Sequence, residues 1–288
     1  MLQGVYVANV TPFRDDANRT VDLDAYRMHV RWLAGNGVTG VVPFGTNGEG
    51  ASVSGPEKVR VLESLVQDDP GIEIVPAAME GNLPDTLDLL ERINDLPVSA
   101  VLVLPPYYFR PVATAGLRSY YERVLQTCTH PVVAYHIPRY AVPVPAELVA
   151  SLPLWGVKNS AGDVDYSAAV RAAGKGVLLG TEDDLAGQLP HAEGAISALA
   201  NIVPEQIVDL FRRVRSAGPG DQAGAERLSA HLRQVRAVTK EYDAPGLLKR
   251  IAEARHGTGM GTVRPPLVPV PATYDASAAV ARLEPPAA

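Results

Sequence analysis

The sequence predicts one large α/β domain, a (β/α)8 (TIM) barrel with a C-terminal helical extension. Eight short apolar segments, rich in Val, Ile and Leu, recur up to residue 197, and longer segments with helical spacing separate them. These segments are apolar at nearly every position, which is typical of parallel strands covered on both faces. A chain of 288 residues is long enough for such a barrel, which takes about 250 residues as a single domain.

The predicted strands are the eight apolar segments themselves, at residues 4–8, 40–44, 73–77, 100–104, 132–135, 155–158, 176–180 and 194–197. Between two of them, Leu83, Leu87 and Leu90 lie at the spacing of one helix face. Pro56, two residues after Ser54, is typical of a helix start. An open, doubly wound sheet fits the same alternation, but eight consecutive units favour a closed barrel.

The alternation of strands and helices stops at Gly218-Pro219-Gly220, a sequence typical of a break between elements. Beyond it the spacing predicts two or three helices, at residues 222–241, 244–255 and 273–284. We therefore expect residues 1–221 to form a catalytic barrel domain. Residues 222–288 should form a helical segment packed on that barrel.

Composition argues against several classes of partner. The formal net charge is -6 and no run of Lys or Arg forms a basic stripe, so we expect no nucleic-acid binding. No apolar stretch reaches about 18 residues, so we expect no membrane span. The first residues lack the pattern of a signal peptide, and we expect a cytoplasmic protein.

Neither a metal nor a cofactor is expected. Cys128 is the only cysteine, which excludes an intrachain disulfide and argues against a cysteine-based zinc site. His136 alone among the six histidines falls at a predicted strand end, and no second ligand stands at metal spacing. The Gly-rich stretches 45–50 and 257–261 lack the Gly-Lys-Ser/Thr ending of a phosphate loop.

Lys158 is the strongest catalytic candidate, because function in such a barrel lies at the carboxyl ends of the strands. Of the five lysines only Lys158 ends an apolar strand. Burying an ammonium there is costly unless it is paired, and the same desolvation favours the free, nucleophilic amine. A Schiff-base role follows. The alternative is a structural lysine paired with Asp163 or Glu182.

Hydroxyl groups follow the neighbouring strands. Tyr107 and Tyr108 come after the fourth strand and Tyr135 ends the fifth. Phenol and threonine hydroxyls both donate and accept, so they can move protons at an imine without a metal. Alternatively, these tyrosines pack the rim of the barrel.

The Thr46-Asn47-Gly48 loop suits a small carboxylate, since it offers backbone N–H groups, a hydroxyl and an amide between a strand and a helix. It could equally be a turn that needs Gly48. The acidic run Glu182-Asp183-Asp184 opens a helix after the seventh strand, where capping is the expected role.

At these residues the chain resembles the dihydrodipicolinate synthase / N-acetylneuraminate lyase family of class I aldolases, over nearly its whole length. The similar segments follow the order of the family's motifs: Ala8–Phe13, Gly45–Glu49, Pro106–Pro111, Tyr135–Pro138, Gly156–Asp163, Gly194–Ser197 and Arg264–Leu267.

The resemblance implies a role for each candidate. Lys158 would form the imine, and Tyr135 would transfer protons at the imine and at the substrate carboxylate. Thr46, Asn47 and Gly48 would hold the carboxylate of pyruvate, and Ile196 would line the substrate site. Tyr108 would extend the proton relay, in many members from a neighbouring subunit. The family commonly forms tetramers built from tight dimers, so a homo-oligomer is implied.

Two departures from the family pattern bear on the substrate. The second hydroxyl of the carboxylate loop is Asn47 here, as in the 4-hydroxy-2-oxoglutarate aldolase branch. The synthase branch has an arginine two residues after the proline of its Tyr-Asn-hydrophobic-Pro motif, to hold the second substrate's carboxylate. Here Tyr140 occupies that position and Arg139 lies one residue early.

We therefore expect a lyase that joins or splits a carbon–carbon bond through a Lys158 Schiff base with pyruvate or another 2-keto acid. Candidate substrates are a 2-keto-3-deoxy sugar acid and 4-hydroxy-2-oxoglutarate. The alternatives are 4-hydroxy-tetrahydrodipicolinate synthase, joining pyruvate and aspartate semialdehyde, and a dehydratase acting through the same imine. A non-catalytic 2-keto-acid-binding relative is also open, although binding alone would not require a nucleophilic amine.

Overall fold

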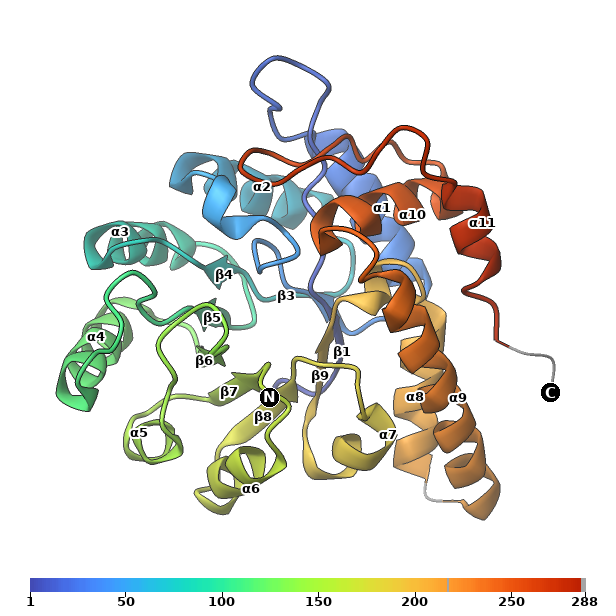
Figure 1. Ribbon diagram of the computed structural model, residues 1–288. Coiled ribbons are helices and arrows are strands. Elements are labelled where there is room, and N and C mark those ends of the chain that lie inside the picture. Colours follow the sequence, from blue (N-terminus) through green and yellow to red (C-terminus); the bar gives the residue numbers. More distant parts are fainter. Residues whose placement is uncertain (217, 286–288) are drawn as a thin grey trace.

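The computed structural model describes residues 1–216 and 218–285 and consists of one curled parallel sheet surrounded by helices (Figure 1). Its strands follow the order β3-β2-β1-β9-β8-β7-β6-β5-β4, and every pairing in the sheet is parallel. The strands are β1 (Gly4–Val7), β2 (Gly40–Val41), β3 (Glu73–Ile74), β4 (Ala77–Ala78), β5 (Val101–Val103), β6 (Val132–His136), β7 (Gly156–Asn159), β8 (Gly176–Leu179) and β9 (Gly194–Ser197). Each of the eight predicted strand segments contains a strand, so the prediction of an α/β fold with a parallel sheet is confirmed.

The two ends of this strand order belong to one stretch of chain, residues 73–78. On one side the N–H of Val75 donates to the carbonyl of Val41 over 2.9 Å, and on the other side the N–H of Leu102 donates to the carbonyl of Pro76 over 2.9 Å. Proline has no N–H to offer its neighbouring strand, which accounts for the break between β3 and β4. The sheet therefore curls until both its ends meet in this stretch.

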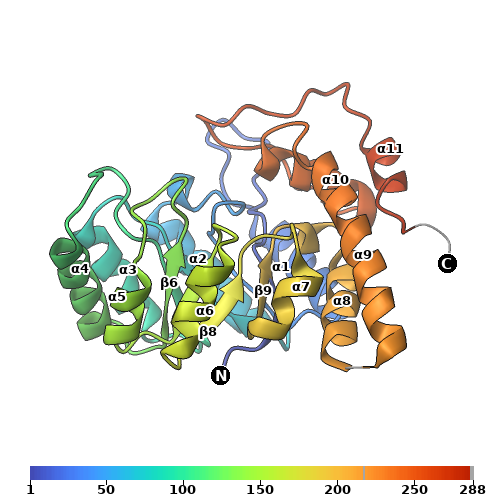
Figure 2. The same ribbon diagram turned by 60° about the horizontal axis from the view of Figure 1, so that its bottom comes forward.

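Helices cover the outside of the sheet (Figures 1 and 2). In chain order they are α1 (Leu23–Gly35), α2 (Gly55–Asp68), α3 (Leu83–Ile93), α4 (Thr114–Thr127), α5 (Ala146–Ser151), α6 (Val164–Ala172), α7 (Leu185–Gln188) and α8 (Pro204–Ser216). Side chains cap the N-termini of several of these helices. At α1, Asp22 accepts from the N–H groups of Asp24 and Ala25, and at α3, Asn82 accepts from the N–H of Asp85. Such caps satisfy backbone donors that the helix itself leaves free.

Two apolar layers explain why the strands are apolar at every position. Val5 and Val7 pack outward against the helices, whereas Tyr6 between them packs into the interior of the sheet. Residues 101–103 repeat the pattern, with only Leu102 pointing inward. Because successive side chains of a strand point to opposite faces, a strand that is covered on both faces needs apolar residues throughout.

The C-terminal part consists of α9 (Pro219–Val238), α10 (Ala244–His256) and α11 (Ala276–Ala281). Helix α9 runs beside α8, and α10 contacts α11 (Figure 2). Leu247, Leu248 and Ile251 of α10 are fully buried. No helix in the described part of the chain combines the length and the apolar character that crossing a bilayer requires.

The chain after α10 returns to the N-terminal loop. The N–H of Phe13 donates to the carbonyl of Met260 over 3.1 Å. The next residue, Gly261, has a φ of +62°, and a Cβ atom there would lie 1.9 Å from the Phe13 carbonyl oxygen. Only glycine permits both this dihedral angle and this approach of two backbones.

A buried histidine links α1 to the sheet and to α10. His29 is fully buried; its Nδ1 lies 3.2 Å from Nε2 of His256 and its Nε2 lies 3.1 Å from Oδ1 of Asn201. Asn201 in turn accepts from the N–H of Val10 and donates to the carbonyl of Ala8. Burial, reinforced by His256, lowers the pKa of His29 from 6.5 to about 3. His29 is therefore neutral in the folded protein at neutral pH.

We predict that His29 makes the fold acid-sensitive. In the unfolded chain His29 binds a proton near pH 6.5, whereas in the folded chain it does so only near pH 3. Between these values the unfolded state binds more protons, so the free energy of unfolding falls as the pH falls. By linkage this one group should remove about 2 kcal/mol between pH 7 and pH 5.

Urea unfolding at pH 7 and pH 5 tests this with His29→Gln and, as a control, the exposed His191→Gln. We expect His29→Gln to lower stability at pH 7 but to reduce the difference between the two pH values by about 2 kcal/mol. His191→Gln should leave that difference unchanged. An equal acid loss in wild type and His29→Gln would contradict the prediction.

Candidate active site

Lys158 and Tyr135 face each other at the carboxyl end of the sheet, where parallel strands present their functional side chains. They are register partners on β7 and β6. The Nζ atom of Lys158 lies 3.3 Å from the Tyr135 hydroxyl and 4.4 Å from the centroid of its ring. Both side chains are about 3% exposed. The strand register therefore holds a buried amine against a phenol.

Thr46 extends this contact to a third strand. Its Oγ1 lies 3.2 Å from the Tyr135 hydroxyl, and either atom can be the donor. Thr46 stands in the loop after β2, across the interior of the sheet from β6 and β7. The result is a hydrogen-bonded chain from Thr46 through Tyr135 to Lys158. A proton can move along it, because each hydroxyl both donates and accepts.

Neither carboxylate considered as a partner for Lys158 is bonded to it in the described part of the chain. Asp163 caps α6 and accepts from the N–H of Tyr166 over 3.0 Å. Glu182 pairs with Arg236 and accepts from the Ser197 hydroxyl over 2.8 Å. The structure thus gives Lys158 a hydroxyl neighbour, and each of these two carboxylates has other partners.

The loop of residues 44–49, between β2 and α2, has a strained backbone. Phe44 and Glu49 both have positive φ angles, 64° and 52°. A Cβ atom at Gly48 would lie 2.8 Å from the carbonyl oxygen of Asn9 and 2.9 Å from the N–H nitrogen of Phe44, so glycine is required there. The side chains of Thr46 and Asn47 remain half-buried. Gly48 thus has a packing role, whatever it does in binding.

A buried ion pair holds this loop to the C-terminal part. The side chains of Glu49 and Lys249 are both fully buried, and their charged atoms lie 2.5 Å apart. The second oxygen of Glu49 accepts from the N–H of Arg264 over 2.9 Å, and Lys249 also donates to the Thr262 carbonyl over 2.9 Å. Burial lowers the pKa of Lys249 to about 8, although Glu49 opposes this shift. Removing one partner of such a pair leaves an uncompensated buried charge, which costs about 3–5 kcal/mol.

The lysine pattern of the sequence does not predict this pair, because Lys249 stands within the predicted helix at residues 244–255 and ends no apolar strand. The signal lies in its apolar neighbours, since Leu247, Leu248, Ile251 and Ala252 of α10 are buried around it. Lys58 on α2 is a second buried lysine of this kind: it is 1% exposed and forms an ion pair with Glu80.

The other predicted site residues lie in several different environments. Ile196 is buried inside the sheet in the same apolar group as Tyr135. Tyr108 is 81% exposed and packs edge-on against Phe109, outside the Thr46–Tyr135–Lys158 chain. Arg139 is also exposed, with its guanidinium 5.3 Å from the ring centroid of Tyr140.

His136, at the end of β6, has a structural environment. Its Nδ1 lies within hydrogen-bonding distance of the backbone N–H and carbonyl of Val144, and its ring stacks on Tyr166 with centroids 4.0 Å apart. Asp184 likewise caps α7, as expected for the acidic run, by accepting from the N–H of Gly187.

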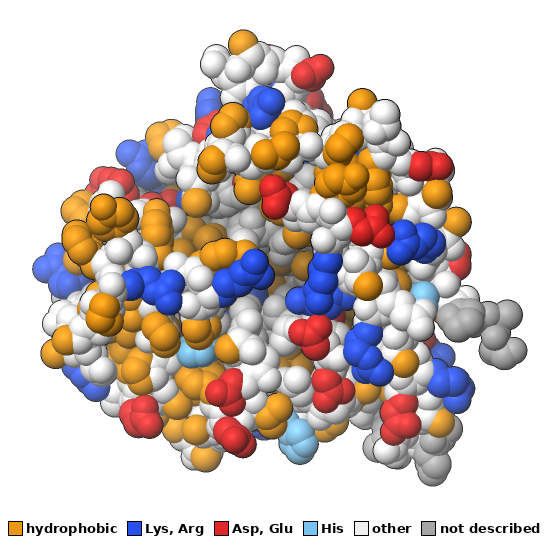
Figure 3. Space-filling model, viewed as in Figure 1, with side chains coloured by type: hydrophobic (Ala, Val, Ile, Leu, Met, Phe, Trp, Pro, Cys, Tyr) orange, Lys and Arg blue, Asp and Glu red, His pale blue; other side chains and the backbone are white. Residues whose placement is uncertain are grey.

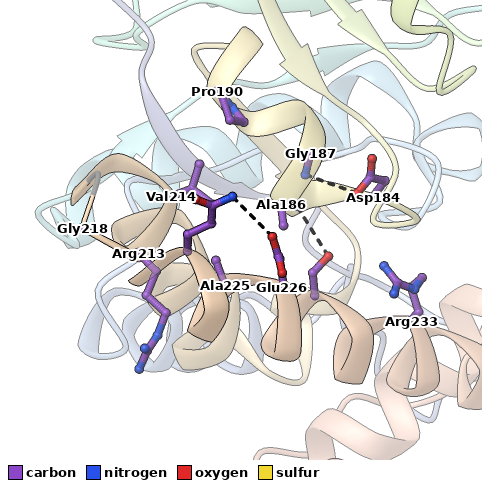
Figure 4. A pocket seen from close by; sticks show the side chains of 12 residues that line it. Asp184, Ala186, Gly187, Pro190, Arg213, Val214, Gly218, Ala225, Glu226 and Arg233 are labelled. Carbon is purple, nitrogen blue, oxygen red and sulfur yellow. Dashed lines mark hydrogen bonds between the residues drawn. The ribbon is translucent and has the colours of Figure 1, made fainter. Parts of the chain in front are cut away.

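A pocket of about 330 Å³ adjoins the hydrogen-bonded side chains of Thr46, Tyr135 and Lys158. Thr46 and Tyr140 are among its lining residues. The space-filling view looks onto the carboxyl ends of the strands and shows a hollow near the middle of this face, with hydrophobic side chains around its upper part (Figure 3). A larger cavity of about 600 Å³ lies between α7, α8 and α9 and is lined by Asp184, Arg213, Glu226 and Arg233, among others (Figure 4). Its lining includes none of Thr46, Tyr135 and Lys158, whereas that of the smaller pocket includes Thr46, so the smaller pocket is the candidate active site.

Known proteins resemble this chain along almost its whole length. The model of the dihydrodipicolinate synthetase family matches residues 1–282. The 4-hydroxy-tetrahydrodipicolinate synthase of Anaeromyxobacter sp. (strain K) is 32% identical over 280 residues, which cover 93% of this chain and 92% of that protein.

Solved structures support the fold. The N-acetylneuraminate lyase of Proteus mirabilis superposes with a TM-score of 0.88 at 23% identity, covering 98% of this chain and 97% of that one. A variant of the 2-keto-3-deoxygluconate aldolase of Sulfolobus solfataricus gives a TM-score of 0.89 at 19% identity, covering 97% and 94%. The family model and the 32% identical relative, each matching almost the entire chain, show that the chain belongs to the dihydrodipicolinate synthetase family.

Proposed function

We propose that this protein is a class I aldolase in which Lys158 forms a Schiff base with pyruvate or a related 2-keto acid. The observation that carries the proposal is the hydrogen-bonded chain from Thr46 through Tyr135 to the buried amine of Lys158. A buried lysine without a carboxylate partner is suited to act as a nucleophile, and the two hydroxyls provide the proton transfers that imine formation needs.

In this mechanism the Lys158 amine attacks the ketone carbon of the 2-keto acid, and the carbonyl oxygen takes up a proton. Loss of water from the resulting carbinolamine gives the imine. Loss of a proton from the adjacent carbon then gives an enamine, which attacks the aldehyde carbon. Tyr135 donates and recovers these protons, while the hydroxyl of Thr46 and the loop at Asn47 and Gly48 receive the substrate carboxylate.

We further propose that the curled sheet is a (β/α)8 barrel, with residues 1–221 as the catalytic domain and residues 222–288 as a helical segment packed on it. The hydrogen bonds on both sides of residues 73–78 support closure. The Glu49–Lys249 pair supports a role for the C-terminal segment in holding the carboxylate loop.

A second candidate is 4-hydroxy-tetrahydrodipicolinate synthase, because that is the name of the relative from Anaeromyxobacter. This activity would require a cation for the carboxylate of aspartate semialdehyde. Tyr140 stands at the position where the synthase branch has its arginine, and a phenol cannot form the two parallel hydrogen bonds of a guanidinium. Arg139 would have to leave its exposed position beside Tyr140 to supply the charge.

We also propose that the protein forms a homodimer or homotetramer in which Tyr108 reaches the site of a neighbouring chain. Tyr108 is 81% exposed and Phe109 is 73% exposed, on the loop that follows β5. Two adjacent exposed aromatic side chains are typical of protein interfaces, and their burial stabilises association.

The first test is borohydride reduction in the presence of pyruvate. Each chain should gain one reduced pyruvate adduct, located on Lys158 by peptide mass spectrometry, because an imine is the only reducible link this site makes. Lys158→Ala should gain none, and Lys240→Ala, a change at an exposed lysine, should label as wild type does. Labelling that persists in Lys158→Ala would disprove the assignment.

The second test removes the phenol of the relay. Tyr135→Phe should lower kcat by about 10²-fold or more, because the general acid–base contribution of a positioned hydroxyl is of that size. The ring and its packing remain, so thermal stability should change little. Wild-type turnover in Tyr135→Phe would rule out proton transfer by this hydroxyl.

The third test concerns assembly. Light scattering of the wild-type protein should give the mass of a dimer or tetramer. Tyr108→Ala should weaken the assembly and lower kcat, whereas Tyr242→Ala, which changes a 43% exposed tyrosine elsewhere, should do neither. A fully active monomer would contradict both parts of this proposal.

A further inference from the structure

We propose that Thr11 is a positioning residue for the 2-keto acid: its hydroxyl holds the turn at residues 46–49 in the shape that receives the substrate carboxylate. This inference rests on the proposed function, since it concerns how the same site is kept ready for its substrate. It comes from one buried contact. Thr11 is fully buried, and its hydroxyl donates to the carbonyl of Gly48 over 2.7 Å.

The peptide group between Gly48 and Glu49 is bonded at both of its polar atoms. Its carbonyl accepts from Thr11, and its N–H, which belongs to Glu49, donates to the carbonyl of Thr46 over 3.2 Å. This peptide group cannot rotate without breaking a hydrogen bond inside the protein. The turn from Thr46 to Glu49 is therefore fixed in one shape, and Thr11 supplies the bond that comes from outside the turn.

The shape of this turn leaves donors for an anion. In the described part of the chain, the backbone N–H groups of Asn47 and Gly48 donate to no backbone carbonyl. Backbone N–H groups in a turn are suited to bind a carboxylate, and the hydroxyl of Thr46 stands beside them. Rotation of the peptide group after Gly48 would change the direction of its neighbours. The bond from Thr11 therefore bears on ligand binding as well as on folding.

The strain in the loop of residues 44–49 is what the Thr11 hydroxyl opposes. The positive φ angles of Phe44 and Glu49 persist only where neighbouring groups maintain them. If the Gly48 carbonyl lost its donor, rotation toward another donor would be favoured over leaving a buried acceptor unsatisfied. Loops with a rotated carbonyl would not receive the carboxylate, so the apparent dissociation constant rises as the competent fraction falls.

Thr11 can hold the loop because its own segment is fixed. The next residue is a proline, which restricts Thr11 to an extended backbone. On one side of Thr11, the N–H of Val10 donates to Oδ1 of the fully buried Asn201 over 3.0 Å. On the other side, the N–H of Phe13 donates to the chain that follows α10. The Thr11 hydroxyl thus joins the loop to a segment that cannot follow it if it moves.

The test uses borohydride trapping with two ketones: pyruvate and acetone, which lacks a carboxylate. The quantity measured is the ketone concentration that gives half-maximal labelling of Lys158. Thr11→Val keeps the size of the side chain and removes its hydroxyl. It should raise this concentration about tenfold for pyruvate, the size expected when a buried carbonyl loses its donor, and leave it within about twofold for acetone. Thr11→Ser, which keeps the hydroxyl, should stay within about twofold of wild type for both ketones.

Thr86→Val is the matched control. Thr86 is also fully buried, and its hydroxyl donates to a backbone carbonyl, that of Asn82, over 2.8 Å. The substitution removes the same kind of hydrogen bond from α3, outside the loop of residues 44–49. It should lower thermal stability much as Thr11→Val does, and it should leave the half-maximal concentrations of pyruvate and acetone unchanged.

The outcomes separate this inference from the proposed function. Failure to trap pyruvate in wild type would overturn the proposed function and this inference with it. Normal trapping in wild type, with no change for pyruvate in Thr11→Val, would overturn only this inference. An equal rise for pyruvate and acetone would do the same, because the amine itself would then be disturbed, as would a tenfold rise in Thr86→Val.

A second variant covers the case in which Thr11→Val does not fold. Thr11→Ala, which also lacks the hydroxyl, is then measured in its place with the same expected result. If neither variant folds, Thr11 serves the fold alone, and its role as a positioning residue is overturned.

Discussion

The contact between the Lys158 amine and the Tyr135 hydroxyl is the interaction on which the site depends. It exists because β6 and β7 are paired in a register that sets these two residues side by side. That register is specified by the two apolar layers: a slip by one residue would turn each inward side chain outward. The packing of Val133 and Leu178 inside the sheet and of Val157 outside it therefore also determines where the amine stands.

The loop of residues 44–49 is subject to a second constraint, a backbone conformation that residues other than glycine rarely adopt. Positive φ angles at Phe44 and Glu49 each cost about 1–2 kcal/mol and persist only where surrounding structure maintains them. The Glu49–Lys249 ion pair and the hydrogen bond from Arg264 provide this support from the C-terminal part. Parts of the chain that are distant in sequence thus determine the position of Thr46.

The sequence predicted what depends on local pattern. Apolar runs identified every strand segment, and the end of a run identified both Tyr135 and Lys158. The break at Pro76 was not predicted, because it depends on which strand its missing N–H would face. Lys249 was missed because its buried partner is two hundred residues away. Tyr108 was given a role that one chain alone does not provide, since its side chain points into solvent here.

The pairing of β1 with β9 has a consequence for how the protein is made. Gly4 lies opposite Gly194, so the first strand has one unpaired edge until almost two hundred residues have been synthesised. The loop that contains Thr46 is held in place later still, because Lys249 and Arg264, which bind its Glu49, are synthesised only after residue 194. Open strand edges in incomplete chains invite association with other chains, and contacts between distant residues slow folding. On the ribosome this enzyme should therefore remain incomplete, and dependent on protection of its exposed edges, for most of its translation.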